Sequence, residues 1–280
     1  MSHEKVIQAE KFRQMQLLQL DMIAELDKVC RKHDILYTIS CGTLLGAVRH
    51  KGYIPWDDDA DITMLREDYE KFKRYAHEMD SSVCFFQDHT TDPEYLWGYG
   101  KLRRTGTKFV RLGQEHIKCQ TGVSLDVFPL DDVPLSTAGQ MLQDFECFVL
   151  RKILYARVAV KNTYGLEKLV YSILNFIPKE FVYRRFAAYA QKSSNRSPNR
   201  VRVLLFPSFG KVYLKTNPLN TRYSMPKKWF LERAEYEFEG RKLWGIKDYD
   251  AFLRYMYDDY MTLPPLDKRL PHCQVSDYEF

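Results

Sequence analysis

Four aspartates close the stretch that begins at Cys41, and they fall within five residues: Asp57, Asp58, Asp59 and Asp61. They run into Ile62-Thr63-Met64, so the pattern predicts a strand over residues 59–64. Alternate side chains share one face of a strand, so we expect Asp59 and Asp61 to point the same way. Two carboxylates that lie a few ångströms apart repel each other unless a cation sits between them. Hard oxygen ligands of this kind suit Mg²⁺ or Mn²⁺.

A third carboxylate, Asp126, interrupts the apolar run Leu125-Asp126-Val127-Phe128, which predicts a strand over residues 123–130. An isolated carboxylate in such a run is costly to bury unless it is paired or bound to a metal. We therefore predict that Asp59, Asp61 and Asp126 are the catalytic and metal-binding residues. Asp126 is also a candidate base for an incoming hydroxyl group. The roles of Asp57, Asp58, Asp131 and His272 stay open at this point.

The front of the same stretch has the features of an anion site. Gly42-Thr43 lies between an apolar strand-like run, residues 35–40, and a second apolar run that begins a helix. Glycine allows a ligand to approach the backbone, and a helix N-terminus presents free N–H groups to an anion. Gly-Thr alone is a common turn, and an acidic cluster alone is most often a solvated loop. Together, in this order, they favour a phosphate cradle followed by a metal-binding strand.

Two further cations are candidates for phosphate binding. Residues 97–103 and 108–112 predict a hairpin that turns at Thr105-Gly106, and alternation places Lys101 and Arg103 on one face of it. Lysine would meet phosphate oxygens as a point charge and arginine as a bidentate fork. The alternative for both residues is ordinary surface charge.

The remaining pattern predicts an α+β protein, with a mixed sheet flanked by helices and a helical subdomain. A helix over residues 4–33 is expected from its three- and four-residue apolar spacing. Residues 136–192 predict helices that break near 162–165 and at Pro178. A polar loop at 193–200, a hairpin at 235–243 and a helix at 249–260 follow. We divide the chain into a catalytic core at 1–135, a mainly helical part at 136–234 and a C-terminal segment at 235–280 that packs back on the core.

Composition limits the functional classes. The chain has 280 residues and is 45% hydrophobic, as expected for a protein with a full core. No signal peptide is evident, and no apolar run reaches the roughly 18 residues that span a bilayer. The six cysteines have no CxxC spacing, which favours reduced thiols over a zinc site. Net charge is +5, but residues 151–202 contain twelve Lys or Arg and two Glu, which suggests an anionic partner.

The segment GTLLGAVRHKGYIPWDDDADI resembles the signature of the LicD phosphotransferases, relatives of fukutin and fukutin-related protein within the nucleotidyltransferase-fold superfamily. Later blocks are similar as well: Lys101-Leu102-Arg103, the segment 124–131 and the segment 260–265. The resemblance implies a nucleotidyltransferase-like core. It also makes Gly42, Thr43, Arg49, Trp56, Lys101 and Arg103 the substrate-binding candidates.

The resemblance further implies CDP-choline as donor and a bacterial surface glycan, such as teichoic acid or lipooligosaccharide, as acceptor. We expect metal-dependent transfer of phosphocholine, or of a similar phospho-substituent, to a glycan hydroxyl. The expected location is the cytoplasm, with peripheral contact between the basic segment and an anionic membrane. Two alternatives remain: a nucleotidyltransferase acting on RNA or a small molecule, and a non-catalytic nucleotide- or metal-binding module. The basic segment fits RNA, but no RNA-binding motif accompanies it, so no nucleic acid is expected.

Overall fold

The computed structural model describes residues 4–190, 196–206, 224–271 and 273–280. Its main sheet has nine strands, in the order β3-β4-β6-β2-β1-β10-β9, with β7 paired to β6 and β8 paired to β7. The β2–β6 and β1–β10 pairs are parallel and the others are antiparallel, so the sheet is mixed. The predicted α+β class is thereby confirmed. The strands are β1 Thr38–Ile39, β2 Asp61–Leu65, β3 Cys84–Gln87, β4 Gly100–Arg104, β6 Ser124–Pro134, β7 Arg196–Arg202, β8 Met225–Pro226, β9 Arg233–Phe238 and β10 Arg241–Ile246.

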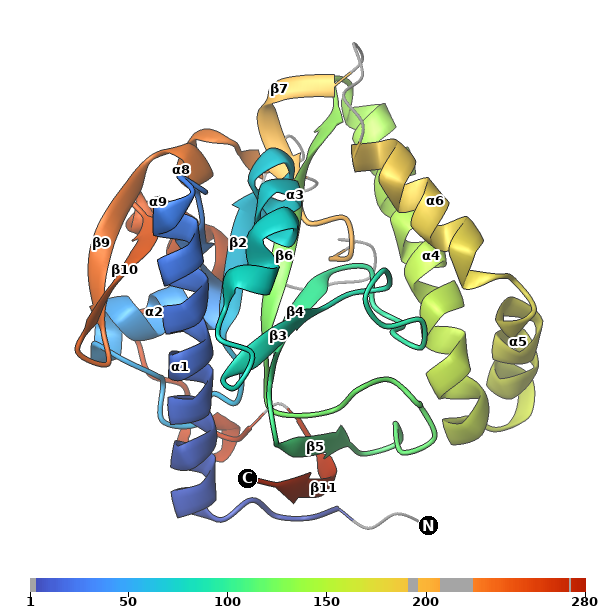
Figure 1. The fold of residues 1–280 in the computed structure, drawn as a ribbon. Coiled ribbons are helices and arrows are strands. Elements are labelled where there is room, and N and C mark those ends of the chain that lie inside the picture. The colour runs from blue at the N-terminus through green and yellow to red at the C-terminus, as the bar shows by residue number, and fades with distance from the viewer. Residues whose placement is uncertain (1–3, 191–195, 207–223, 272) are drawn as a thin grey trace.

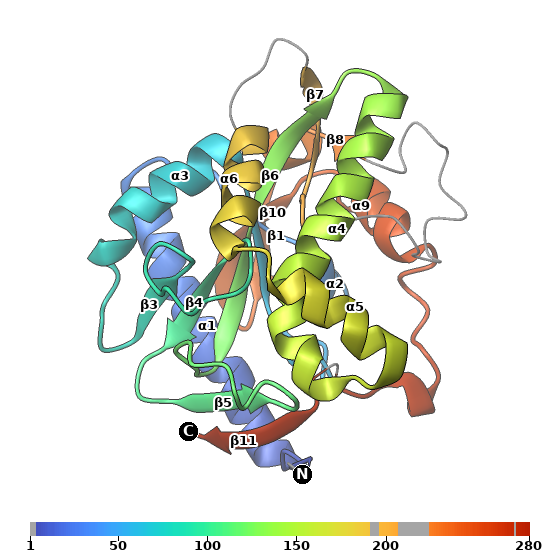
Figure 2. The same cartoon turned by 90° about the vertical axis from the view of Figure 1, so that its right-hand side faces the viewer.

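Helices surround this sheet in two groups (Figures 1 and 2). Helices α1 and α3 contact each other, and both contact β6. Helices α4, α5 and α6 form a separate group on the right of Figure 1, where α4 and α6 contact β6. The helices are α1 Ala9–Lys32, α2 Cys41–His50, α3 Arg66–Tyr75, α4 Thr137–Asn162, α5 Gly165–Asn175, α6 Lys179–Ala190, α8 Lys228–Leu231 and α9 Tyr249–Tyr257.

Helix α1 connects the core to the acidic stretch. Its apolar stripe, which includes Met22, Ile23 and Leu26, is fully buried. Two buried glutamines on the same helix donate to backbone carbonyls of the segment before β2. Gln16 Nε2 bonds Asp57 O at 3.0 Å, and Gln19 Nε2 bonds Asp58 O at 2.9 Å. Since buried carbonyls need donors, these amides hold an irregular segment in place without strand pairing.

The predicted hairpin at residues 97–112 is wrong. β4 is flanked by β3 and β6, so both of its edges are already paired. The following strand, β5 Lys108–Arg111, instead pairs with β11 Val275–Glu279 in a separate two-stranded sheet. β5 therefore pairs with the distant strand β11 and not with its neighbour in the chain, β4.

The boundaries of other elements also differ from the predictions. Helix α1 begins at Ala9 rather than residue 4, because the chain before it runs extended and Lys5 bridges to Val275. β2 begins at Asp61, so Asp59 precedes the strand. Residues 196–200, predicted as loop, belong to β7 and pair with β6 and β8, while 193–195 lie outside the described residues. The breaks between α4, α5 and α6 and the 233–246 hairpin agree with the predictions.

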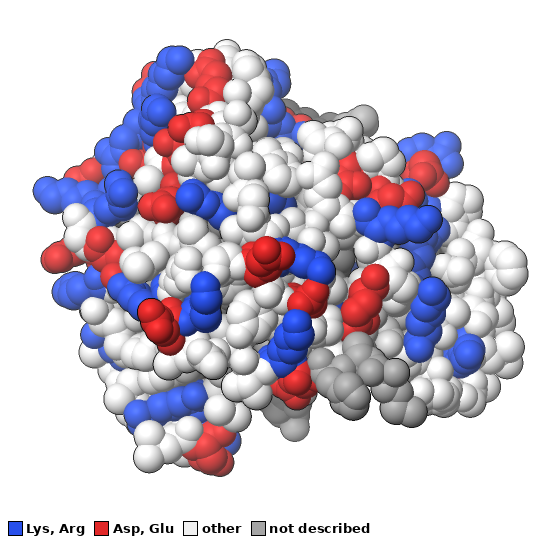
Figure 3. Space-filling view, turned by 60° about the horizontal axis from the view of Figure 1, so that its bottom comes forward, with Lys and Arg blue, Asp and Glu red and all other residues white. Residues whose placement is uncertain are grey.

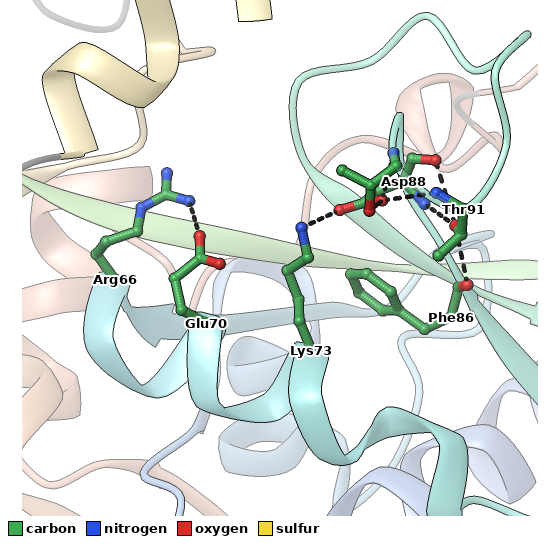
Figure 4. A network of polar contacts seen from close by, with 7 residues as sticks. Arg66, Glu70, Lys73, Phe86, Asp88 and Thr91 are labelled. Atoms are coloured by element: carbon green, nitrogen blue, oxygen red, sulfur yellow. Dashed lines mark hydrogen bonds and ion pairs between the residues drawn. The ribbon is translucent and has the colours of Figure 1, made fainter. Parts of the chain in front are cut away.

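Ion pairs hold α3 against the sheet (Figure 4). Arg66 donates two hydrogen bonds of 2.8 Å to Asp131 at the far end of β6, and it also bonds the exposed Glu70. Lys73 pairs with Asp88, which accepts from Thr90 in the turn after β3. Asp131 lies five residues beyond Asp126 in β6, or roughly 16 Å at the usual rise per residue. It is therefore part of a structural ion pair and lies far from the acidic stretch.

Replacing Asp131 should expose this role. Asp131→Asn leaves the Arg66 guanidinium without its buried counter-charge, so we expect the free energy of unfolding to fall by about 3 kcal/mol. The control is Glu70→Gln, which removes the exposed partner of the same arginine and should cost about 1 kcal/mol or less. Urea denaturation measures both variants. Equal losses of unfolding free energy in the two variants would show that the buried Arg66–Asp131 pair stabilises the fold no more than the exposed Arg66–Glu70 pair does.

Candidate active site

A row of polar side chains crosses four neighbouring strands of the main sheet. In the parallel β2–β6 pair, Asp61 lies opposite Asp126. In the antiparallel β4–β6 pair, Asp126 lies opposite Lys101, and Lys101 in turn lies opposite Gln87 of β3. Residues opposite each other on paired strands project from the same face, about 5 Å apart. The row therefore holds two acids, a lysine and an amide side by side.

Asp126 is the best-connected member of this row. Lys101 Nζ donates to one of its carboxylate oxygens, and the Tyr99 hydroxyl donates to the other at 3.0 Å. Asp126 and Lys101 are both buried, at 8% and 4% exposed. Lys101 therefore compensates the buried charge of Asp126. Asp61 has no equivalent partner in the row.

The N-terminus of α2 is fastened to the acidic strand. The Asp61 N–H donates to Thr43 Oγ1 at 2.8 Å, and the Ser40 N–H donates to Asp61 O at 3.0 Å. A Cβ atom on Gly42 would lie 2.4 Å from Asp57 Oδ2, so only glycine permits this approach. The first turn of α2, with the free N–H groups of a helix start, thus lies directly beside the aspartates.

The segment before β2 brings further carboxylates together. One oxygen from each of Asp57, Asp58 and Asp59 lies within 4.8 Å of the others. The Asp58 side chain also accepts from the Cys273 N–H at 2.8 Å, which ties the C-terminal segment to the site. The neighbouring Asp59 is one of the causes that raise the pKa of Asp57, after burial.

A cavity of about 640 Å³ opens over these aspartates. Asp57, Asp59 and Asp61 line one side, together with Gly42 of α2. The segment that ends α9 and follows it also lines the cavity, with residues 257–260 and 262–265. We call this space the acidic cavity. Its size is within the usual range for small-molecule sites.

The electrostatics of the acidic cavity are strongly unbalanced. Burial raises the pKa of Asp61 well above its ordinary value, and the charges of Asp59 and Asp126 raise it further. Burial, followed by the charge of Asp59, raises the pKa of Asp57 to about 8. Carboxyl groups in this state hold protons at neutral pH unless a cation replaces them.

This donor set fits a divalent metal ion. The side chains offer carboxylate oxygens, which are the ligands that Mg²⁺ and Mn²⁺ prefer, and three of them line an open cavity. Both oxygens of Asp126 already accept a hydrogen bond, but each keeps a second lone pair. The fit includes Asp57, which the sequence left undecided.

The structure brings most of the sequence-predicted residues to this place. Gly42, Arg49, Trp56, Asp59 and Asp61 line the acidic cavity. The remaining candidates lie beneath or beside it. Thr43 is 3% exposed and holds the Asp61 N–H, while Asp126 and Lys101 continue the row away from Asp61.

Arg103 is the exception among the candidates. Its guanidinium bonds Gln87 Oε1 at 2.7 Å and Gly122 O at 2.9 Å, and it does not line the acidic cavity. Both contacts are internal, so Arg103 braces β4 against its neighbours. Its position in the chain, two residues from Lys101, gave no sign of this difference.

Sequence reasoning did not assign a role to Arg111 of β5. Burial opposes the charge of Arg111, but Cys273, Asp126 and Tyr99 outweigh it and raise the pKa of the guanidinium. It therefore stays charged beside the acids. Its position follows from the pairing of β5 with β11, which no local pattern announced.

Comparison with known proteins agrees with this geometry. Residues 34–151 match the family model described as LicD/FKTN/FKRP, nucleotidyltransferase domain. The chain carries a LicD-family domain. The candidate metal ligands, from Asp57 to Asp126, all lie inside this match.

Several individual proteins are similar to this chain. The lipopolysaccharide cholinephosphotransferase LicD of Haemophilus influenzae is 26% identical over 275 residues, which cover 93% of this chain and 95% of that protein. An uncharacterized protein of Rickettsia typhi is 45% identical over 53 residues, and one of Rickettsia prowazekii is 49% identical over 47 residues. These two cover 19% and 17% of this chain.

The raised pKa values predict how stability depends on pH. The pKa of Asp57 is 3.8 ordinarily and about 8 in the folded protein, so the folded state binds more protons between these limits. The free energy of unfolding of the metal-free protein should therefore fall as pH rises through this window. We expect a lower Tm at pH 8 than at pH 6 in EDTA, and a smaller difference for Asp57→Asn.

The exposed Asp267 supplies the control for this experiment. Asp267→Asn should keep the pH dependence of the unmodified protein. A pH dependence that is the same in Asp57→Asn and the unmodified protein would mean that Asp57 does not hold a proton in the fold.

Proposed function

We propose that this protein transfers phosphocholine, or a similar phospho-substituent, from a CDP-linked donor to a hydroxyl group of a bacterial surface glycan. The observation that carries the proposal is the acidic cavity, where Asp57, Asp59 and Asp61 face the first turn of α2. Similarity to the Haemophilus cholinephosphotransferase over 93% of the chain supports the same reaction class.

Asp59, Asp61 and Asp126 would hold Mg²⁺ or Mn²⁺, with Asp57 as a fourth candidate ligand. When bound, the metal neutralises charge on the diphosphate of the donor and on the group in transfer. The first turn of α2 points free N–H groups at the same phosphates, and Gly42 leaves room for them. Arg49 lines the cavity and contributes a positive charge.

The polar row beyond Asp61 offers a group that can accept the proton of the incoming hydroxyl group. Asp126 accepts hydrogen bonds from Lys101 and Tyr99, which fix the position of its carboxylate. A hydroxyl group bound beside Asp126 would meet a carboxylate oxygen, the kind of group that can act as a general base. Lys101 would then balance the charge of the row.

The wall of the acidic cavity suits a choline head group. It carries the aromatic residues Trp56, Tyr257 and Tyr260 together with the carboxylates Asp258 and Asp259. Quaternary ammonium groups bind to aromatic faces and gain from nearby negative charge. The Trp56 ring already receives the Arg269 guanidinium at 5.3 Å, so it can accept a cation in this position.

Substitution of the aspartates tests the reaction. Asp61→Asn and Asp126→Asn should each reduce release of CMP from CDP-choline by at least about 100-fold, because each removes a carboxylate that would hold the cation balancing the charge of the transferred phosphate. Chromatography of nucleotide products with CDP-choline, CTP and ATP as donors measures this and separates phosphocholine transfer from nucleotidyl transfer. Asp277→Asn, at an ion pair on the surface, is the control and should leave the rate unchanged. Full activity in either site variant would refute the assignment.

We further propose that the protein meets its glycan acceptor at an anionic membrane surface through α5. No helix in the described ranges is long and apolar enough to cross a membrane. Helix α5 nevertheless exposes large apolar side chains: Leu166 at 76%, Leu169 at 57%, Ile173 at 61% and, just after it, Phe176 at 86%. The region at the right of Figure 3, where α5 lies, is largely white with blue side chains at its margin.

Basic residues border this apolar face. Lys161 and Lys168 are exposed on either side of the start of α5, and Lys179 follows its end. An apolar helix face flanked by lysines is the pattern of interfacial helices, and each lysine near an anionic surface adds about 1 kcal/mol. Arg185, also basic, is less suited to this role because it pairs with Glu146 at 2.6 Å.

Liposome sedimentation tests the α5 contact. The protein should co-sediment with phosphatidylserine-containing vesicles at low salt and be partly released at high salt, because attraction between exposed charges is screened. The double variant Ile173→Ser/Phe176→Ser should bind at least about 10-fold less, since it removes apolar area from the interface. Leu270→Ser, at a residue that is 63% exposed elsewhere, is the matched control. Equal binding of all three proteins would exclude α5 as the contact.

A further inference from the structure

A second cavity lies between the helical group and the core, and the function proposed above does not use it. Its volume is about 260 Å³. Leu96, Leu154, Val158 and Leu205 give it an apolar floor. The groups that could recognise a ligand are Trp97, Tyr99, Arg111, Gln114, Arg151 and Tyr155. We call it the Arg111 cavity.

The two arginines of the Arg111 cavity are not committed to carboxylates. Arg66, Arg185 and Arg202 each have an ion-pair partner. Within the described part of the chain, neither Arg111 nor Arg151 makes a side-chain hydrogen bond or a salt bridge. A guanidinium group carries five N–H donors and prefers the planar oxygens of carboxylates and phosphates. The cavity therefore offers two sets of donors to an anion.

The aromatic residues add a second kind of recognition. Trp97 and Tyr99 line the cavity from the core, and Tyr155 lines it from α4. Tyr155 is 47% exposed. Rings that combine an apolar face with a polar edge pack well against sugars, whose C–H and O–H groups alternate in the same way. Hydrogen-bond donors for an anion, together with aromatic faces, are the features expected of a binding site for a charged sugar.

The Arg111 cavity and the acidic cavity approach the same carboxylates. The Tyr99 ring lines the Arg111 cavity, while its hydroxyl donates to Asp126 at 3.0 Å. Asp126 lies opposite Asp61, and Asp61 lines the acidic cavity. A group bound in one cavity is thus separated from the other by the Asp61–Asp126 pair and the Tyr99 ring.

We propose that the Arg111 cavity binds an anionic sugar, one that carries a phosphate or a carboxylate group, as the acceptor side of the transfer site. This assignment to the acceptor rests on the function proposed above. The donor would occupy the acidic cavity, and the sugar would present a hydroxyl group to Asp126 from the Tyr99 side. Arg111 and Arg151 would select glycans whose acceptor unit is negatively charged.

Binding of small sugars without donor or metal tests the cavity directly. Glucose 6-phosphate, glucuronate and neutral glucose are titrated into the full-length protein in EDTA, and affinity is measured by calorimetry. At least one of the two anionic sugars should bind, and glucose should bind at least about 10-fold more weakly, the difference expected when charge-assisted hydrogen bonds are lost. The preferred anion tells phosphate from carboxylate recognition. Arg151→Gln should weaken that binding by about the same factor, whereas Arg184→Gln, an exposed arginine of α6, should not.

Tryptophan fluorescence locates the bound sugar. Trp97 lines the Arg111 cavity and Trp56 lines the acidic cavity. The fluorescence change caused by the anionic sugar should disappear in Trp97→Phe and persist in Trp56→Phe. The proposal is overturned if glucose binds as tightly as the anionic sugars, if neither anion binds, or if the signal depends on Trp56. The binding experiment needs no turnover. A negative binding result would therefore not refute the transfer reaction, and a negative transfer assay would not refute sugar binding.

Discussion

Two carboxylates sit next to each other in the middle of a buried sheet, and the surrounding structure compensates for them. Asp61 and Asp126 are register partners on parallel strands, so the β-sheet itself fixes their separation. Two like charges in this position would destabilise the fold without compensation. Lys101 and Tyr99 stabilise Asp126 on one side. On the other side, Asp61 lines an open cavity, where a proton or a bound cation can balance its charge.

Elements from distant parts of the chain keep this arrangement in place. Helix α1 supplies amides that hold the backbone before β2, and α2 places the Thr43 hydroxyl under the Asp61 N–H. The C-terminal segment returns to donate the Cys273 N–H to Asp58. Residues after α9 line the acidic cavity. The LicD-family match ends at residue 151, so part of the site comes from the chain beyond it.

The sequence revealed the parts of the site that have a local signature. A carboxylate in an apolar strand pointed to Asp126, and a glycine before an apolar run pointed to Gly42; Asp126 lies in β6, and Gly42 lies in the first turn of α2. Boundaries were less predictable, because Asp59 precedes β2 and is held by contacts from α1 to its neighbours. Arg111 had no local signature at all. Its position depends on β5 pairing with the last strand, a choice made by tertiary structure after β4 had lost both free edges.

The place where a divalent ion binds tests the central claim most directly. Crystals of the protein grown with Mn²⁺ and CDP-choline would show the ion by its anomalous scattering. The account predicts a manganese peak about 2.2 Å from a carboxylate oxygen of Asp61 and from one of either Asp59 or Asp126. The diphosphate of the donor should also coordinate the ion. A peak held by Asp58 alone, or donor bound in the acidic cavity with no ion beside Asp61, would contradict it.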